Sequence, residues 1–238
     1  MALRLGDKAP NFKANTTIGP MDIKFHEYIK GSWAILFSHP DDYTPVCTTE
    51  LSAVALSYAD FESRGVKLIG LSANNVDSHS AWIKDINGLS PEGPGLDFPI
   101  IGDEDRKIAT LYGMLDNLDK TNVDKKGLPL TVRTVFILDP NQVIRLTLAY
   151  PASTGRNFVE IARVVDSMQL GDKYRITTPA NWHVNVNGKT EDRVIVHPSV
   201  QGEEVQKLFG DKVDTVYPYL RFTPDPSLEK PIWGIIGV

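Results

Sequence analysis

Residues 33–72 read WAILFSHPDDYTPVCTTELSAVALSYADFESRGVKLIGLS, and this stretch decides the fold. It opens with Trp33–Ser38 and closes with Val66–Ser72, two short apolar runs typical of strands that are covered on both faces of a parallel sheet. Between them, residues 48–64 carry apolar side chains at helical spacing, and the pattern ends at Gly65. A strand, a helix and a second strand over this length predict a βαβ unit with a right-handed crossover.

The alternation of helices and strands continues to about residue 170. Helices are predicted over 77–86, 103–112 and 156–170, and strands over 98–101, 134–138 and 143–149. A turn signal, Asp-Pro-Asn-Gln at 139–142, separates the last two strands. The pattern predicts one compact α/β domain over residues 1–170.

The rest of the chain has a different character. Residues 172–238 hold six prolines and one predicted helix, at 203–209, and they end in the apolar segment PIWGIIGV (231–238). An apolar strip of this length cannot form a core of its own, and an exposed one associates with other surfaces. We therefore predict a smaller second domain over 171–238 whose end packs on its own domain or on a partner subunit.

Charge and hydropathy exclude several classes of protein. The net charge is −5 and the sequence pI is near 5.5, whereas nucleic-acid-binding proteins show basic patches, so we predict no nucleic-acid partner. No apolar run approaches the roughly 18 residues that span a bilayer. Residues 1–10 lack the apolar core of a secretory signal. We expect a cytoplasmic protein with no integral membrane segment.

The chain has a single cysteine, Cys47. An intrachain disulfide and a two-thiol redox cycle within one chain are therefore impossible. Cys47 is either an inert, buried small residue or a lone reactive thiol. The histidines outside its neighbourhood show no metal-ligand spacing, so we predict neither a metal site nor a cofactor; they are His26, His79, His183 and His197.

The residues before Cys47 favour the reactive thiol. Thr44 is a good N-cap residue and Pro45 suits the first helical position, which places Cys47 in the first turn of the helix. Unpaired backbone N–H groups and the positive end of the helix dipole there favour thiolate over thiol. The oxygen of Thr44 can accept a backbone N–H while its hydroxyl hydrogen points at sulfur or substrate. The loop also lies beyond the carboxyl end of a strand, where open α/β sheets bind ligands.

The pattern Pro40-x-x-x-Thr44-x-x-Cys47 resembles the active-site signature of the peroxiredoxins, peroxidases of thioredoxin-like fold. The longer stretch HPDDYTPVCTTE (39–50), together with the C-terminal extension, is similar to the 1-Cys, peroxiredoxin-6-like subfamily. The resemblance implies a thioredoxin-like fold with a smaller C-terminal domain that contributes to a homodimer.

By this resemblance, Cys47 is the peroxidatic cysteine, Thr44 hydrogen-bonds the peroxide and the sulfur, and Pro40 shields the site from water. Arg133 matches the active-site arginine of the family. Glu50 lies about one helical turn after Cys47, where it could hold that arginine. Without the resemblance, Arg133 could equally be a surface arginine at a strand end, and Glu50 a solvated residue of the first turn.

Two further residues are candidates for supporting roles. His39 matches a residue that lies beside the sulfur in this subfamily, although it could simply hydrogen-bond the loop. Arg156 is a candidate second, outer arginine.

The expected reaction is attack of the Cys47 sulfur on one oxygen of a hydroperoxide, which yields water or an alcohol and a cysteine sulfenic acid. The substrates would be hydrogen peroxide and organic or lipid hydroperoxides. Thiolate formation alone gives only a several-fold acceleration, because nucleophilicity falls with pKa. The larger contribution should be stabilisation of negative charge on the leaving oxygen by Arg133, Thr44 and first-turn N–H groups. With no second cysteine, reduction needs an external thiol such as glutathione, or a donor delivered by a partner protein.

Other functions remain open at this point. The resemblance also implies a lipid hydrolase site at Ser32, His26 and Asp139, but Ser32 lacks the flanking glycines of a G-x-S-x-G turn and reads better as the first residue of a strand. A peroxide sensor or a holdase chaperone is a second alternative. A sensor would consume about one peroxide per chain and an enzyme many.

Overall fold

The computed structural model describes residues 3–18, 23–186 and 189–228, and it divides into two compact units, Met1–Phe158 and Val159–Val238. The boundary lies at the start of helix α6 (Phe158–Tyr174). The sequence analysis predicted the domain boundary near the other end of the same helix, at residue 170. None of the described helices is long and apolar enough to cross a membrane.

The first unit is built on a five-stranded sheet with the strand order β5-β4-β3-β6-β7. Its strands are β3 (Trp33–Ser38), β4 (Val66–Ser72), β5 (Ile100–Gly102), β6 (Arg133–Leu138) and β7 (Ile144–Tyr150). The pairs β3–β4 and β4–β5 are parallel, while β3–β6 and β6–β7 are antiparallel. The sheet and the helices around it confirm the predicted α/β, thioredoxin-like class.

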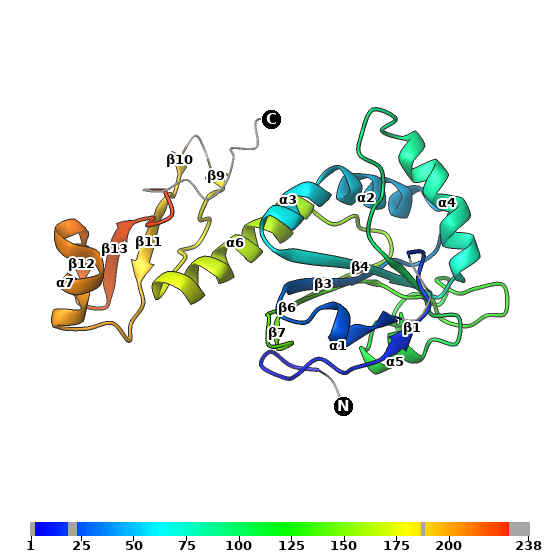
Figure 1. Ribbon diagram of the computed structural model, residues 1–238, viewed down its shortest axis with the longest axis horizontal. Helices are drawn as coiled ribbons and strands as arrows, with labels where there is room; N and C mark the ends of the chain where they lie inside the picture. The colour runs from blue at the N-terminus through cyan, green and yellow to red at the C-terminus, as the bar shows by residue number, and fades with distance from the viewer. Residues whose placement is uncertain (1–2, 19–22, 187–188, 229–238) are drawn as a thin grey trace. The chain divides into compact units, whose positions relative to one another are not determined.

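Helices cover both faces of this sheet (Figure 1). On one side lie α2 (Pro45–Leu56), α3 (Tyr58–Ser63) and α4 (Val76–Gly88); on the other lie α1 (Phe25–Tyr28) and α5 (Lys107–Leu111). The second face is sealed by a cluster that includes Phe25 of α1, Leu36 of β3 and Tyr112. A two-stranded ribbon, β1 (Lys13–Ala14) with β2 (Ile23–Lys24), adjoins this side.

Two predicted helices differ from the observed ones. The helix expected over 48–64 is divided at Ser57 into α2 and α3. The helix expected from Asp103 begins only at Lys107, because Arg106 adopts a left-handed backbone with φ of 57°. The buried Asp103 carboxylate instead accepts the backbone N–H groups of Ile108 and Ala109 from outside the helix.

The second unit combines the remainder of α6 with a four-stranded sheet of order β12-β13-β11-β8. Its elements are β8 (Ile176–Thr177), β9 (Asn185–Val186), β10 (Lys189–Thr190), β11 (Arg193–Val196), α7 (Glu203–Phe209), a 3-10 turn (Gly210–Lys212), β12 (Asp214–Tyr217) and β13 (Leu220–Pro224). Leu170, Ile176, Trp182 and Val194 form its small core.

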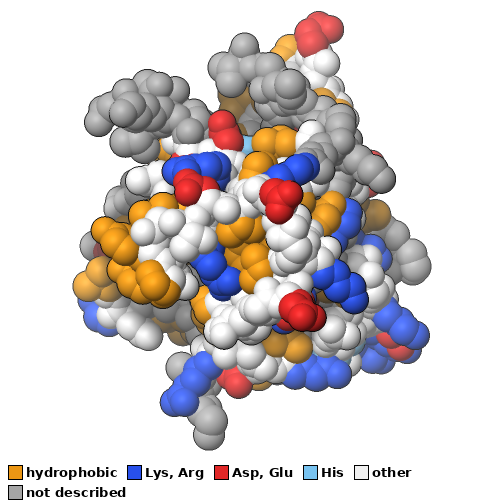
Figure 2. All heavy atoms as spheres, turned by 90° about the vertical axis from the view of Figure 1, so that its left-hand side faces the viewer, with side chains coloured by type: hydrophobic (Ala, Val, Ile, Leu, Met, Phe, Trp, Pro, Cys, Tyr) orange, Lys and Arg blue, Asp and Glu red, His pale blue; other side chains and the backbone are white. Residues whose placement is uncertain are grey.

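The second unit exposes several large apolar side chains: Val159, Val184, Leu208, Val216, Tyr217, Tyr219 and Leu228. Tyr217 and Tyr219 stack with their ring centroids 5.5 Å apart. Figure 2 shows a face of the molecule on which apolar side chains lie between basic and acidic ones. The apolar segment 231–238 lies outside the described residues.

Candidate active site

The carboxyl end of β3 positions the candidate site. The chain leaves β3 at Ser38, passes through the loop 39–44 and enters α2 at Pro45. Because β6 runs antiparallel to β3, with Phe37 opposite Val135, the first residue of β6 lies at this same end of the sheet. That residue is Arg133. The topology therefore brings the first turn of α2 and a guanidinium together.

The start of α2 has the predicted backbone but not the predicted cap. Thr44 is extended, Pro45 is the first helical residue and Cys47 is the third. The hydroxyl of Thr44, however, donates to the carbonyl oxygen of Asp41 at 2.9 Å and accepts no helix N–H. Tyr43 precedes it with a left-handed φ of 55°. The Thr44 hydrogen is thus held within the loop, not aimed at the sulfur.

Cys47 is fully buried, yet its sulfur contacts a charged group. The Nη1 atom of Arg133 lies 3.3 Å from Sγ, and the arginine side chain is itself only 3% exposed. Two further N–H groups of Arg133 donate to the carbonyl oxygen of Ala152, at 3.0 and 2.6 Å, and fix the orientation of the guanidinium. An inert packing cysteine needs no such neighbour. The contact therefore favours a reactive thiol.

Glu50 joins two arginines to the site. Its carboxylate accepts from Arg133 Nη1 at 2.7 Å and from Arg156 Nη2 and Nε at 2.8 and 3.0 Å. It also accepts the backbone N–H of Arg156 at 2.6 Å. Burial raises the pKa of Glu50, but the hydrogen bonds and charge of Arg156, with the charge of Arg133, lower it below the ordinary value. Two guanidinium groups and one carboxylate leave a net positive charge beside the sulfur.

The sequence analysis proposed Arg156 as a second, outer arginine, whereas the structure places it at the centre of the site. It is buried, its Nη1 donates to the carbonyl oxygen of Thr134 at 3.2 Å, and its guanidinium lies 5.3 Å from the ring centroid of Phe37. Pro40, the predicted shield, is also buried.

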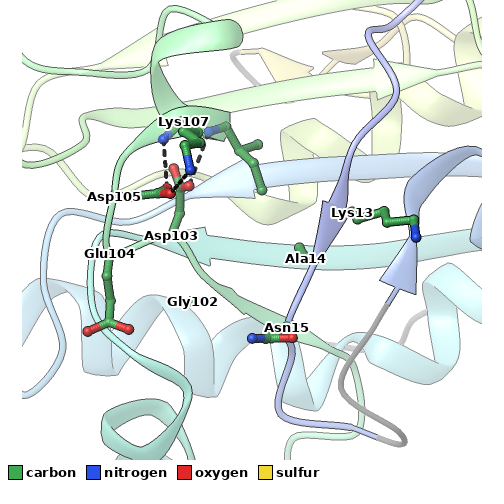
Figure 3. A pocket seen from close by; sticks show the side chains of 9 residues that line it. Lys13, Ala14, Asn15, Gly102, Asp103, Glu104, Asp105 and Lys107 are labelled. Atoms are coloured by element: carbon green, nitrogen blue, oxygen red, sulfur yellow. Dashed lines mark hydrogen bonds and ion pairs between the residues drawn. The ribbon is translucent and has the colours of Figure 1, made fainter.

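Two surface hollows in the described part of the chain are not lined by Cys47. The larger, of about 400 Å³, is lined by Lys13, Ala14, Asn15, Gly102, Asp103, Glu104, Asp105, Lys107 and Ile108 (Figure 3). Its acidic and basic groups are partly paired with each other, as in the ion pair of Lys107 with Asp105. The smaller, of about 250 Å³, is lined by residues that include Ser32, Tyr28 and Lys67. Cys47 lines neither of them.

The candidate hydrolase residues do not form a hydrogen-bonded triad in the described part of the chain. The Nε2 atom of His26 lies 2.7 Å from the carbonyl oxygen of Ala9. The Asp139 carboxylate accepts two backbone N–H groups of its own turn and lies 3.5 Å from Arg145. Ser32 immediately precedes β3 and is not its first residue.

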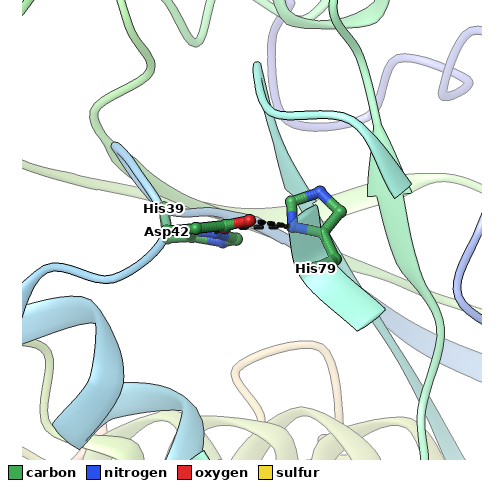
Figure 4. Close-up of side chains that lie close together, drawn as sticks. All are labelled: His39, Asp42 and His79. Carbon is green, nitrogen blue, oxygen red and sulfur yellow. Dashed lines mark hydrogen bonds and ion pairs between the residues drawn. The ribbon is translucent and has the colours of Figure 1, made fainter. Parts of the chain in front are cut away.

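A buried polar network lies in the loop after β3 (Figure 4). His39 Nε2 is 2.8 Å from Asp42 Oδ1, and His79 Nδ1 of α4 is 2.8 Å from Asp42 Oδ2. Burial raises the pKa of Asp42, but hydrogen bonds from the two histidines lower it far below its ordinary value. Burial lowers the pKa of His39. Within the described residues, the side chain of His39 is hydrogen-bonded to Asp42 and not to Cys47, so its predicted place beside the sulfur stays a prediction.

Sequence reasoning missed Asp42 and His79 as members of this site. Asp42 lay inside the quoted motif, and an acidic residue in a short buried loop was the available signal. No signal in the sequence pointed to His79, because only the parallel pairing of β3 with β4 brings α4 next to the loop. The nitrogen–oxygen separations are ordinary hydrogen-bond distances. The three side chains are linked by hydrogen bonds, but the buried Nδ1 atom of His39 has no hydrogen-bond partner among the described residues. The absence of a metal site stays a prediction.

Comparison with known proteins places this geometry in a family. Residues 5–147 match the sequence model of the AhpC/TSA family. Peroxiredoxin-6 of Bos taurus and of Homo sapiens are each 49% identical over 231 residues, which cover 94% of this chain and 98% of each relative. Peroxiredoxin-6 of Gallus gallus is 48% identical over 232 residues.

Solved structures give the same result. A cysteine-to-serine mutant of the peroxiredoxin 6 of Arenicola marina matches with a TM-score of 0.85 and 44% identity, over 94% of this chain and 99% of that one. A yeast mitochondrial 1-Cys peroxiredoxin, described with a thiol-resolving mechanism through the glutathione and thioredoxin systems, matches with a TM-score of 0.79 and 44% identity. It covers 93% of this chain and 99% of its own.

Proposed function

The chain belongs to the AhpC/TSA family as a 1-Cys peroxiredoxin, a thiol-dependent peroxidase, and we propose that it reduces hydrogen peroxide and organic or lipid hydroperoxides through Cys47. The observation that carries this proposal is the contact of 3.3 Å between the Cys47 sulfur and the buried guanidinium of Arg133. Sulfur, a fixed cation and the first turn of a helix coincide at one point.

The reaction uses these groups in sequence. The sulfur of Cys47 attacks one peroxide oxygen, the O–O bond breaks and negative charge grows on the departing oxygen. Arg133 lies where it can neutralise that charge, and Glu50 with Arg156 holds it there. In a site closed to water, preorganised cations of this kind stabilise a transition state more than the same groups in solution. The products are water or an alcohol and Cys47 sulfenic acid.

Thr44 and Pro40 have narrower proposed roles. The Thr44 hydroxyl exchanges its bond with the Asp41 carbonyl for one to the peroxide when substrate binds. Pro40, buried in the loop, excludes water from the sulfur.

An external thiol completes the cycle, because Cys47 is the only cysteine of the chain. We propose glutathione, or a thiol carried by a partner protein, as the donor. The yeast relative that is resolved through glutathione and thioredoxin supports this choice. The thiol attacks the sulfenic sulfur and releases water, and a second thiol then restores Cys47.

We also propose that residues 171–238 contribute to a homodimer and that the protein acts in the cytoplasm. The exposed apolar side chains of the second unit support the first proposal, since surface of this kind commonly marks an interface. Sedimentation at micromolar concentration should give a mass near twice 26.4 kDa; a monomer at all concentrations would remove the proposal.

Peroxide turnover tests the central proposal. Purified protein is supplied with hydrogen peroxide or a lipid hydroperoxide and with a panel of thiols, and the oxidation state of Cys47 is followed by mass spectrometry. We expect many turnovers per chain with wild type and none with Cys47→Ser. Consumption of a single equivalent would indicate a sensor, and full activity of Cys47→Ser would disprove the mechanism.

A further inference from the structure

The segment that follows β7, residues 151–156, lies against the first turn of α2. Gly155 in this segment is exposed, and a methyl group on its Cα atom would lie 3.5 Å from Cγ1 of Val46, an ordinary van der Waals separation. Val46 is half-buried and directly precedes Cys47 in the helix. The backbone at residue 155 therefore faces the turn that carries the sulfur, with space for about one methyl group between them.

The same segment is anchored at both ends to groups that surround the sulfur. The Nη1 atom of Arg133 lies 3.3 Å from Sγ, while Nε and Nη2 of the same guanidinium donate to the carbonyl oxygen of Ala152 at 3.0 and 2.6 Å. At the other end, the backbone N–H of the buried Arg156 donates to Glu50 at 2.6 Å. Residues 153–155, between the anchors, are exposed. This stretch can move while both anchors stay in place.

The loop before the sulfur, residues 39–44, is held more firmly. Asn74 donates to the carboxylate of Asp41 at 2.6 Å and accepts the backbone N–H of Asp42 at 3.2 Å. Asp42 is itself buried in the network of histidines after β3. Displacing this loop would leave buried polar groups unsatisfied, which is costly. The less costly way to uncover the sulfur is to move residues 153–155 away from the first turn of α2.

The backbone of residue 155 does not itself require glycine. Gly155 is not among the glycines with positive φ, so alanine can adopt the same conformation. The methyl group of that alanine would touch Val46 without a clash. What glycine provides at this position is space beside the first turn of α2.

We propose that Gly155 and Val46 are specificity-determining residues: a hydroperoxide reaches Cys47 between them, and the width of this gap sets how bulky a hydroperoxide can be and still react quickly. This inference rests on the proposed peroxidase function. Cys47 has no exposed surface, so entry requires residues 153–155 and the Val46 side chain to move apart. Hydrogen peroxide needs a small displacement, and a hydroperoxide with a bulky carbon group needs a larger one.

The first test compares hydrogen peroxide with cumene hydroperoxide as substrates of the full-length protein. In Gly155→Ala the added methyl group narrows the gap, so kcat/KM for cumene hydroperoxide should fall about tenfold relative to kcat/KM for hydrogen peroxide, the lower end for one methyl-sized change in an apolar site. Val46→Ala widens the gap and should shift this ratio in the opposite direction. The double variant should return the ratio toward the wild-type value, because both changes act on one contact.

The matched control is Gly88→Ala, which adds the same methyl group at the last residue of α4. There the methyl group meets no atom of the described chain within 4 Å outside its own helix. The ratio of the two substrates should stay at the wild-type value. Thermal unfolding shows which of the variants are folded.

The second test reads access to the sulfur without peroxide turnover. Cys47 is the only cysteine, so mass spectrometry of the intact, reduced chain follows its alkylation directly. Iodoacetamide is the small reagent and monobromobimane the bulky one, and glutathione gives the reference rates of an unhindered thiol. We expect Gly155→Ala to slow monobromobimane more than iodoacetamide, and Val46→Ala to accelerate monobromobimane more than iodoacetamide.

These outcomes separate the inference from the function on which it rests. Folded Gly155→Ala and Val46→Ala proteins with wild-type selectivity in both assays would overturn the proposed entrance, and the peroxidase assignment would survive. If Gly155→Ala does not fold, Val46→Ala decides, since unchanged rates with the bulky substrate and the bulky reagent would also overturn it. An active Cys47→Ser would instead remove the peroxidase function, and the alkylation rates would still show where the sulfur is reached.

Discussion

Removing the guanidinium of Arg133 tests the electrostatic part of the mechanism. A charge pair at the observed 3.3 Å interacts by about 5 kcal/mol at an effective dielectric constant of about 20. Part of this remains in Arg133→Ala, because Arg156 and Glu50 stay near the site. Loss of one preorganised donor to a developing oxyanion costs about 2.7–4 kcal/mol, or about 10²–10³-fold. We therefore expect kcat/KM for hydrogen peroxide to fall by that factor.

The assay must separate loss of charge from loss of the thiol. Peroxide consumption is measured by stopped flow, and the Cys47 thiol is counted in the same samples after denaturation. Arg145→Ala is the matched control: it removes one arginine from the neighbouring strand β7, where the guanidinium lies 5.4 Å from the ring centroid of Trp33. Wild-type kcat/KM in a folded Arg133→Ala protein with its thiol intact would refute the reasoning.

Three further predictions concern stability. Glu50→Gln leaves two buried guanidinium groups without their carboxylate and should lower the free energy of unfolding by about 3–5 kcal/mol; a urea titration showing less than about 1 kcal/mol would contradict it. The pKa values of Asp42 and Glu50 are depressed in the folded protein, so their contribution to the free energy of unfolding is present above about pH 4 and is lost as the pH falls through the folded values. Unfolding titrations from pH 7 to 3 should show this decline in stability, and a flat profile would exclude it. Asp103→Ala removes the acceptor of two buried N–H groups at the start of α5 and should cost about 1–3 kcal/mol, whereas Asp105→Ala, at an exposed position, should cost little.

Much of the fold was predictable because it depends on local patterns. The runs Trp33–Ser38 and Val66–Ser72 are β3 and β4 with the predicted bounds, since apolar strands between turn signals leave few alternatives. The position of Cys47 followed from Thr44 and Pro45 in the same way. The start of α5 was missed because the Asp103 side chain accepts helix N–H groups from beyond a residue with left-handed backbone. The spacing of apolar residues contains no signal for such a start.

The side-chain contacts of the site were less predictable. The pairing of Glu50 with Arg133 was proposed from helical spacing. The hydrogen bonds from Arg156 to the same carboxylate could not be, because Arg156 lies 106 residues further along the chain. His79 meets Asp42 only after two strands have paired. The Thr44 hydroxyl donates to a nearby loop carbonyl and does not cap the helix. Such choices depend on tertiary distances that one-dimensional spacing does not contain.

The complete enclosure of the Cys47 sulfur, with no exposed surface, means that a reagent reaches it only when the groups that cover it move aside. Oxidation by any peroxide then proceeds at the intrinsic chemical rate multiplied by the fraction of time the entrance is open to a molecule of that size. Hydrogen peroxide, with two heavy atoms, needs a smaller opening than a lipid hydroperoxide or a bulky alkylating agent. Selectivity among oxidants is then set by the size of that opening as well as by the chemistry of the sulfur.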